Sequence, residues 1–322
     1  MTAPVPPLDV VPLQMHHLPD AAALACRRYG TLREVVPSLP PRYEDPQIVL
    51  PMLRDIAASA PGVAAMRGGR LVGFLAAFLL PDFRGKRAVY SPEWANAAEG
   101  TDARRIYEAM YTSLAAHWVS DRALTHLIGA LPHERELLEA WHWLGFGMLA
   151  ADAVRGLSPL AGPAAEVEIR RATQQDIEVC APLQAALQRH LASSPTYLVT
   201  EEDEDPSCAR WLADPAHALW LAYHNGQAVA YLRIEPASAD ACTLIRDAGT
   251  ASITGAYTMP QARGGGIGSA LLDPALAWAR EEGYLRCAVD FEPMNVLAAR
   301  FWLRHFQPVC YALVRQIDER IG

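Results

Sequence analysis

The chain has 322 residues, 51% of them apolar and 20% charged, and its formal net charge is −8. This composition is typical of a globular protein, and the length allows two domains of ordinary size. Because the charge is negative and no basic stripe is present, we expect no nucleic acid partner, although an acidic surface is compatible with cationic substrates.

The six cysteines lie singly and form no C-x-x-C motif, so neither a zinc site nor a redox pair is expected. His133-Glu134 is not followed by a second histidine one turn later, and we expect no metal. The N-terminus lacks the basic and apolar blocks of a signal peptide, and no apolar stretch is long enough to span a bilayer. These features predict a cytoplasmic protein without membrane association.

The first half of the chain contains three local patterns. Residues Val10–Asp20 predict a strand that leads into a helix. Residues Val63–Leu80 predict a hairpin that turns at Gly68-Gly69 between two apolar runs. Residues Trp141–Phe146 predict an aromatic helix that ends on a phenylalanine.

The same three patterns recur about 160 residues later. Residues Glu166–Asp176 again predict a strand leading into a helix, and Leu219–Ile234 predict a hairpin that turns at Asn225-Gly226. Residues Phe301–Phe306 repeat the aromatic helix. A repeat of this length is too long for a solenoid and predicts a duplicated domain.

The boundary between the copies is predicted at Leu157–Pro163, where proline, glycine and small residues interrupt any periodicity. We therefore expect one domain over residues 1–160 and a second over residues 161–322. An acidic run, Glu201–Asp205, precedes the second hairpin; it is either a solvated loop or a feature that attracts a cationic amine.

The second copy contains a glycine-rich stretch between a strand and a helix. Ser252–Thr258 predicts the strand, and apolar residues at helical spacing follow, namely Ile267, Leu271, Leu272, Leu276 and Ala279. Gly264–Gly266 and Gly268 lack the Cβ atoms that would keep a ligand from the backbone. Since the first N–H groups of a helix are unpaired and carry partial positive charge, the stretch predicts a phosphate site.

Two common phosphate motifs can be excluded. A Walker A loop requires Gly-Lys-Ser/Thr, whereas Gly268 is followed by Ser269 and Ala270. A dinucleotide fingerprint would require glycine at Ser269 or at Leu271. What remains is the pattern Arg263-x-x-Gly266-x-Gly268, which Pro260 precedes.

A second motif follows downstream, where Val289–Trp302 reads as a strand, an asparagine and a helix. Asn295, Ala298, Phe301 and Trp302 form the pattern Asn-x-x-Ala-x-x-Phe-aromatic, and Gln307–Ile317 predicts a terminal strand. Together with the glycine-rich loop, this order of elements resembles the GCN5-related N-acetyltransferase (GNAT) family. The resemblance is specific from about Glu166 to the end of the chain.

The resemblance implies an α/β (α+β GNAT) fold with two tandem GNAT-like domains. Each would have a mixed, mostly antiparallel sheet with a splayed central strand pair, flanked by helices. It implies acetyl-CoA as co-substrate, with no metal. The implied cofactor-binding residues lie in the strand end, the glycine loop and the following helix, namely Thr258, Met259, Arg263, Gly264, Gly265, Gly266, Ile267, Gly268, Ser269, Asn295 and Phe301.

Two of these residues have alternative roles. Arg263 either pairs with the phosphates of CoA or braces the start of the loop. Asn295 either contacts the pantetheine arm or caps the following helix, a position that asparagine favours, and both roles are compatible.

The resemblance also implies how the acyl group is activated. Backbone N–H groups around Tyr257–Met259 would polarise the thioester carbonyl where the strand splays from its neighbour, with Thr258 as the expected donor. Many family members carry a tyrosine at Trp302 as general acid, and tryptophan cannot take this role. Tyr257 and Tyr311 could replace it as general acid, on the basis of residue type alone. Asp290 and Glu292, which would lie on one face of a strand, are candidate general bases.

The first copy differs at the position of the glycine loop. Tyr90–Ala95 aligns with Thr258–Arg263, with proline at equivalent places, but Ala95 replaces the arginine. Residues Asn96–Glu99 replace the glycines, and a carboxylate at Glu99 would repel a pyrophosphate. We therefore expect a degenerate first domain, whereas Pro274 in the second domain should kink or break the helix after the loop.

The resemblance therefore implies an N-acetyltransferase that moves an acetyl group from acetyl-CoA to a primary amine of a small-molecule acceptor, by direct attack in a ternary complex. The alternative is a non-catalytic acyl-CoA-binding or interaction module, favoured by the missing tyrosine and the lack of an obvious base. The sequence leaves open both the acceptor and the oligomeric state, monomer or homodimer.

Overall fold

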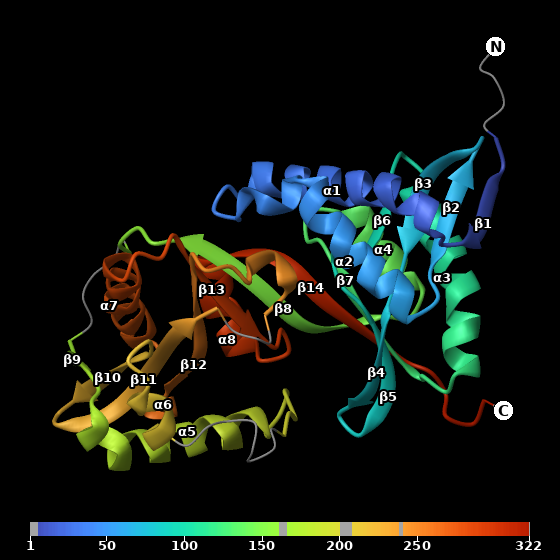
Figure 1. The fold of residues 1–322 in the computed structure, drawn as a ribbon. Coiled ribbons are helices and arrows are strands. Elements are labelled where there is room, and N and C mark those ends of the chain that lie inside the picture. Colours follow the sequence, from blue (N-terminus) through green and yellow to red (C-terminus); the bar gives the residue numbers. More distant parts are fainter. Residues whose placement is uncertain (1–5, 161–165, 200–207, 238–240, 322) are drawn as a thin grey trace. The chain divides into compact units, whose positions relative to one another are not determined.

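The computed structural model describes residues 6–160, 166–199, 208–237 and 241–321 (Figure 1). These residues form two units. Unit 1 takes in the described residues up to Ala151, together with Cys242–Leu244 and those from Val309 onward; unit 2 takes in those from Asp152 to Ala241 and Ile245–Pro308. The chain passes from unit 1 to unit 2 within strand β8 and returns within strand β14, apart from the short segment Cys242–Leu244, which also belongs to unit 1. The duplication itself, with one copy at residues 1–160 and a second at residues 161–322, stays a prediction.

In the described part of the chain, unit 1 contains four α-helices, the strands β1 to β7, and parts of β8 and β14. Its helices are α1 (Leu18–Val35), α2 (Pro46–Ser59), α3 (Ala103–Ser120) and α4 (Arg135–Trp143). Its strands are β1 (Leu8–Pro12), β2 (Val63–Arg67), β3 (Arg70–Leu75), β4 (Phe78–Phe83), β5 (Lys86–Ser91), β6 (Asn96–Ala98), β7 (Thr125–Ala130), the start of β8 (Gly147–Gly156) and most of β14 (Gln307–Gln316).

The strands of unit 1 form two groups, in the orders β1-β2-β3-β6 and β4-β5-β7-β14. The predicted hairpin is β2 and β3, and both residues of its turn, Gly68 and Gly69, have positive φ. Strand β14 pairs antiparallel with β7, from Tyr311 opposite Ala130 to Gln316 opposite Thr125. The C-terminal strand of the chain thus completes the sheet of unit 1.

The core of unit 1 lies beneath α3, whose buried side chains recur at helical spacing. Tyr107 and Tyr111 of this helix pack against Trp141 in edge-to-face contacts. Similar contacts join Tyr111 to Trp118 and Phe146, and Trp141 to Phe146, and all these ring centroids lie 5.1–6.0 Å apart. Leu313 of β14 belongs to the same cluster. The aromatic helix predicted at the end of the first copy is therefore a core element.

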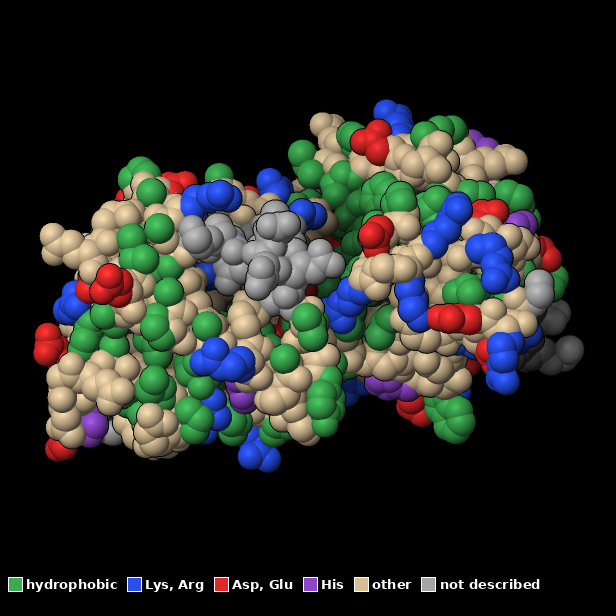
Figure 2. Space-filling model, turned by 90° about the horizontal axis from the view of Figure 1, so that it is seen from below, with side chains coloured by type: hydrophobic (Ala, Val, Ile, Leu, Met, Phe, Trp, Pro, Cys, Tyr) green, Lys and Arg blue, Asp and Glu red, His purple; other side chains and the backbone are tan. Residues whose placement is uncertain are grey.

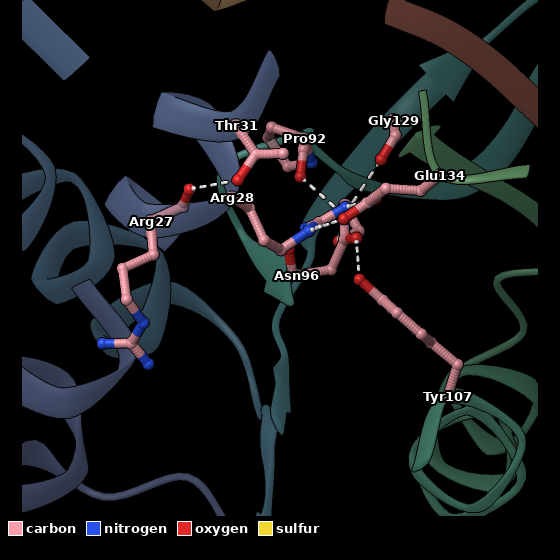
Figure 3. A network of polar contacts seen from close by, with 9 residues as sticks. Arg27, Arg28, Thr31, Pro92, Asn96, Tyr107, Gly129 and Glu134 are labelled. Atoms are coloured by element: carbon pink, nitrogen blue, oxygen red, sulfur yellow. Dashed lines mark hydrogen bonds and ion pairs between the residues drawn. The ribbon is translucent and has the colours of Figure 1, made fainter. Parts of the chain in front are cut away.

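The segment that aligns with the glycine loop is a buried strand in unit 1. Strand β6 pairs with β3, and Asn96 is 1% exposed. Figure 3 shows Asn96 at the centre of a polar network: its amide donates to the carbonyls of Pro92 (2.9 Å) and Gly129 (3.1 Å), and Tyr107 donates to Asn96 Oδ1 (3.0 Å). The backbone and side chains here are occupied by internal bonds.

Arg28 of α1 completes this network (Figure 3). Its Nε donates to Glu134 Oε1 at 2.7 Å, and its guanidinium also contacts the carbonyl oxygen of Asn96. Burial opposes the charge on Arg28, but the adjacent Glu134 carboxylate raises the pKa of the guanidinium above its usual value. Glu99, which follows β6, pairs with Arg27 and Arg70.

Unit 2 is built on a sheet with the strand order β8-β13-β12-β11-β10-β9. Its further strands are β9 (Glu168–Arg171), β10 (Ala218–His224), β11 (Gln227–Pro236), β12 (Thr250–Thr258) and β13 (Arg286–Phe291). Its helices are α5 (Ile177–Leu191), α6 (Cys208–Ala213), α7 (Ile267–Glu281) and α8 (Val296–His305). Asn225 and Gly226, at the turn of the β10–β11 hairpin, both have positive φ, as the sequence predicts.

Helices cover both faces of this sheet. Leu219 and Leu221 of β10 pack in a cluster with α5 and α6, which includes Leu183. Trp220, between them, faces the other way and meets Trp278 of α7 with ring centroids 6.1 Å apart. The predicted architecture, mostly antiparallel sheets flanked by helices, is confirmed.

The central strands of unit 2 separate after a short paired stretch. β12 pairs in parallel with β13 only from Thr250 opposite Arg286 to Ile253 opposite Val289, although β12 continues to Thr258. On its other side, β12 stays paired with β11 as far as Thr258, opposite Ala230. The predicted splay is therefore present, and the second half of β12 has one unpaired edge.

Pro274 was expected to kink or break the helix. A break is wrong, because α7 continues through this residue to Glu281, whereas the kink stays a prediction. Proline removes one helical hydrogen bond. The neighbouring Leu271, Leu272, Ala275 and Leu276 are all buried. Packing of this apolar face stabilises the helix despite the missing bond.

The surface carries charges of both signs. On the face shown in Figure 2, basic and acidic side chains are interspersed among apolar ones on both units. In the described part of the chain, no helix combines the length and apolar character that crossing a bilayer requires. All six cysteines lie in the described part of the chain, where they are buried and form no disulfide bond.

Candidate functional site

A cavity of about 310 Å³ lies in unit 2 beside the unpaired half of β12. We call it the β12 cavity. Residues from α5, β11, β12, the glycine loop, α7 and α8 line it, and they include Leu187, His190, Tyr231, Leu232, Ala256, Tyr257, Thr258, Arg263, Gly264, Gly266, Ile267, Gly268, Ser269, Asn295, Phe301, Trp302 and Arg304. The structure thus brings most of the predicted cofactor residues together.

The glycine loop shapes one end of this cavity. Gly264 and Gly266 have φ of 87° and 78°, a left-handed conformation that favours glycine. A Cβ atom added at Gly264 or Gly265 would meet no heavy atom within 4 Å, so the loop presents open backbone. Gly265 itself does not line the β12 cavity.

Helix α7 begins directly after this loop, with Gly266 as its N-cap. The first helical backbone bond runs from the N–H of Ala270 to the carbonyl of Gly266. The N–H groups of Ile267, Gly268 and Ser269 consequently have no acceptor within the helix, and they carry the positive end of its dipole. This end of the cavity can hold an anion such as a pyrophosphate.

Arg263 connects the loop to β12. Its Nε donates to the carbonyl oxygen of Thr258 at 2.9 Å, and its guanidinium carbon lies 5.6 Å from the ring centroid of Tyr257. These contacts are those of a brace, one of the two roles that the sequence allows. Because Arg263 also lines the cavity, its charge remains close to the loop.

The backbone direction of β12 follows from its pairing with β11. Met259 donates its N–H to the carbonyl of Val229 at 2.8 Å, so alternate residues of β12 face β11. Thr258 and Ala256 therefore direct their N–H groups away from β11, toward the gap left by β13. Thr258 is thus the residue, among those predicted around Tyr257–Met259, whose N–H group points into the gap. Ala256 is a second such donor, which the sequence prediction missed.

Met259 is a correction to that prediction. Since its N–H is bonded to Val229, this group is not available to polarise a ligand. Its side chain packs against the core cluster beneath α5 rather than lining the β12 cavity.

Helix α8 closes another side of the cavity. The side chain of Asn295 accepts a hydrogen bond from the N–H of Ala298 at 3.4 Å, which makes it the N-cap of α8. Asn295 also lines the cavity, so the two roles considered for it are compatible. On the same helix, Phe301 packs against Gly268, and His305 Nε2 lies 3.2 Å from Ser269 Oγ. Burial lowers the pKa of His305, with Arg155 and Arg304 acting in the same direction.

The candidate catalytic residues separate into two groups. Tyr257 lies in the cavity, as does the buried Trp302. Tyr311 belongs to β14 and packs against the core of unit 1, where burial raises its pKa. Asp290 is exposed on β13, and Glu292 follows the end of that strand; neither lines the β12 cavity.

His190 is a cavity residue that the sequence prediction missed. It lies in the last turn of α5, and its ring centroid is 6.2 Å from that of Tyr257. A single histidine on an amphipathic helix gives no spacing signal, so only the fold identifies it. The acidic run Glu201–Asp205, considered as an attractor of amines, lies outside the described residues.

The comparisons with known proteins agree with this arrangement. The model of the Acetyltransferase (GNAT) family matches residues 185–306, a range that contains every residue lining the β12 cavity. A GCN5-related N-acetyltransferase from Sphaerobacter thermophilus has a similar structure, with a TM-score of 0.53 and 16% identity over 98% of this chain and 97% of that chain.

Two further solved structures are similar. One is described as a GCN5-related glucosamine N-acetyltransferase region in a fungal multi-domain GH3 beta-N-acetylglucosaminidase, with a TM-score of 0.51 and 14% identity over 97% of this chain. This chain spans only 38% of that fungal chain. The other, a tandem GNAT protein from the clavulanic acid biosynthesis pathway, has a TM-score of 0.43 and 15% identity over 96% of this chain and 98% of that one.

The search of curated proteins gave no match. At these identities, the two structures with TM-scores above 0.5 show the fold alone, and the relationship rests on the family match. The chain therefore carries a domain of the GNAT acetyltransferase family at residues 185–306.

Proposed function

We propose that this protein is an N-acetyltransferase that moves an acetyl group from acetyl-CoA to a primary amine of a small-molecule acceptor, by direct attack in a ternary complex. Membership of the GNAT family supports acetyl transfer. The observation that carries the proposal is the open start of α7 beside the unpaired edge of β12, in one cavity.

The residues present fit a CoA thioester. The N–H groups at the start of α7 would hold the pyrophosphate, and the open backbone at Gly264 and Gly265 leaves room for it. The bound thioester supplies the acyl group. A backbone N–H of Thr258 or Ala256, held rigidly by β12, would polarise its carbonyl, and one such donor typically lowers the barrier by about 3 kcal/mol.

Tyr257 is the proposed proton donor to the departing thiolate. Trp302 occupies the place where family members often carry a tyrosine, and its indole N–H is not a practical acid. Tyr257 lines the same cavity and takes this role in our proposal. Tyr311 is not part of this proposal, because it packs in the core of unit 1.

Unit 1 is, in this proposal, a degenerate copy that binds no acyl-CoA. Strand β6 uses its backbone to pair with β3 where unit 2 has open glycines. A Cβ atom at Gly129 of β7 would lie 2.6 Å from the backbone nitrogen of Glu93, so the turn after β5 packs directly onto β7. This contact fills the space beyond the β5–β7 pair with the protein's own main chain.

A cytoplasmic location is part of this proposal, whereas the acceptor and the oligomeric state, monomer or homodimer, remain to be identified. The test is an assay of free thiol release from acetyl-CoA with a panel of amines, including amino acids, polyamines, amino sugars and peptides. Thiol release with one amine class, and an acetylated product by mass spectrometry, would support the proposal.

The alternative is a non-catalytic acyl-CoA-binding module, which the tryptophan at position 302 favours. Calorimetry separates the two. Tight binding of acetyl-CoA without thiol release for any amine would favour the module, whereas the absence of binding would contradict both readings.

A further inference from the structure

We infer that His190 is the general base that takes the proton from the attacking amine. This inference rests on the proposed acetyl transfer and adds a residue to it. The observation behind it is that the β12 cavity places this imidazole in the same space as the backbone donors of β12.

The position of His190 is fixed by the end of α5. The carbonyl oxygen of His190 accepts a hydrogen bond from Ser193 Oγ at 2.6 Å and another from the N–H of Ser193 at 3.2 Å. Its half-buried ring stands against Tyr257, with 6.2 Å between centroids and a tilt of 54°. The backbone bonds fix the main chain of His190 at the end of α5, and the ring contact with Tyr257 is the one that bears on the imidazole.

The ring nitrogens of His190 are available to a ligand. Within the described ranges, no side chain or backbone group makes a hydrogen bond with them. Among the residues that the structure describes, His190 is the only histidine that lines the β12 cavity. A half-buried ring with unbonded nitrogens, facing a cavity, can bond to a substrate amine.

The remaining lining offers no better proton acceptor. Among the residues that the structure describes, no aspartate or glutamate lines the cavity, and the charged side chains there are Arg263 and Arg304. Guanidinium groups do not accept protons, and tyrosine ionises only near pH 10. Histidine is the side chain suited to accept a proton near neutral pH.

Two protons move in the proposed reaction step. The amine nitrogen forms a bond to the thioester carbon and loses one proton to a ring nitrogen of His190. The carbon–sulfur bond breaks, and the thiolate that leaves takes a proton from Tyr257. The imidazolium of His190 then returns its proton to solvent, and water restores the proton of Tyr257.

An affinity label tests the position of His190 without requiring the true acceptor. Bromoacetyl-CoA places an electrophilic carbon where the acetyl group would lie; a ring nitrogen bonds to this carbon and bromide leaves. We expect mass spectrometry to find the adduct on His190 of the full chain, and to find none at this position in His190→Gln. Excess acetyl-CoA should protect the wild-type protein.

The outcomes distinguish the two proposals. If calorimetry shows that bromoacetyl-CoA binds but His190 is not labelled, the inference is wrong and the proposed function stands. If acetyl-CoA does not bind at all, the proposed function fails, and the assignment of His190 fails with it.

Turnover gives a second test once an acceptor amine is found. His190→Ala should lower kcat by about 100-fold or more, with acetyl-CoA affinity unchanged, since general bases contribute at least this factor. Free imidazole should restore part of the activity, which a merely structural role would not allow. His224→Gln, an exposed histidine outside the cavity, is the matched control. Wild-type turnover in His190→Ala would overturn the inference.

Discussion

Gly268 of α7 and Phe301 of α8 pack so closely that a Cβ atom on the glycine would lie 3.0 Å from Cε2 and 3.1 Å from Cζ of the ring. Ordinary side-chain packing rarely brings a Cβ atom so near to another carbon. The glycine therefore sets the distance between the two helices that enclose the anion-binding end of the β12 cavity.

Gly268→Ala should displace Phe301 and weaken acetyl-CoA binding. Alanine favours the helix by about 1 kcal/mol over glycine, but overpacking a close contact costs about 1–3 kcal/mol. We therefore expect a net loss of about 1 kcal/mol in unfolding free energy, measured by urea titration, together with lower affinity by calorimetry.

A second substitution tests this explanation. Gly268→Ala combined with Phe301→Leu removes the ring that the new methyl group meets, so part of the stability should return. Gly265→Ala is the stability control, because its Cβ atom would enter open space. Equal losses in the single and double variants would show that the ring contact is not the cause.

Asn295→Ala should destabilise α8. The side chain caps this helix through the N–H of Ala298, and the loss of such a cap costs about 1 kcal/mol. Asn295→Asp should keep the cap and nearly all of the stability, since a carboxylate accepts the same bond and suits the helix dipole.

The same pair of variants separates the two roles of Asn295. If it also contacts the cofactor, Asn295→Asp should weaken acetyl-CoA binding although stability is retained. Unchanged affinity in the aspartate variant would restrict Asn295 to its capping role.

The sequence predicted the features that depend on residues close together in the chain. The Asn225-Gly226 turn and the Asn295 cap rest on residues a few positions apart, so local chemistry determines them. Local chemistry likewise determines the conformation of the loop glycines and the start of α7. The sequence alone therefore identifies most of the residues that line the glycine-loop end of the β12 cavity.

Features that depend on distant partners were not predicted. The alternation of β14 identifies a strand but not its partner, β7, which belongs to the other half of the chain. Asn and Ala have low strand propensity, yet β6 forms because β3 offers it an edge. His190 lines the cavity because α5 packs against β12, and the sequence of α5 alone does not reveal this contact.

Acid should destabilise unit 1 through His126, which is fully buried. Tyr111 Oη lies 2.8 Å from its Nδ1, and its Nε2 lies 3.0 Å from the carbonyl oxygen of Ala123. Nε2 therefore carries the proton in the neutral form, and Nδ1 accepts from the tyrosine. Burial lowers the pKa of His126 to about 4.

The sign of the pH effect follows from this shift. The unfolded chain, with a histidine pKa near 6.5, binds the proton more readily than the folded one. The folded state thus keeps its full stability above about pH 6.5 and loses roughly 3 kcal/mol as the pH falls from there to about 4.

Urea unfolding of the wild type and of His126→Gln at pH 7 and pH 4.5 measures this contribution. We expect the variant to be less stable at pH 7, and its deficit to shrink or reverse at pH 4.5. A deficit that is the same at both pH values would exclude His126 as the source.

The central claim is that the open backbone at the start of α7 binds the pyrophosphate of acetyl-CoA. Calorimetric titration of Gly266→Glu tests it most directly, with Gly266→Asn as the control. Gly266 has a φ of 78°, which asparagine tolerates better than most residues, so the control keeps the backbone without adding a negative charge. Circular dichroism would establish that both variants are folded.

We expect the glutamate variant to lose acetyl-CoA affinity by at least about 100-fold, or about 2.7 kcal/mol, while the asparagine variant retains most of it. If a folded Gly266→Glu protein binds acetyl-CoA as tightly as the wild type, the pyrophosphate lies elsewhere and the account of this site is wrong.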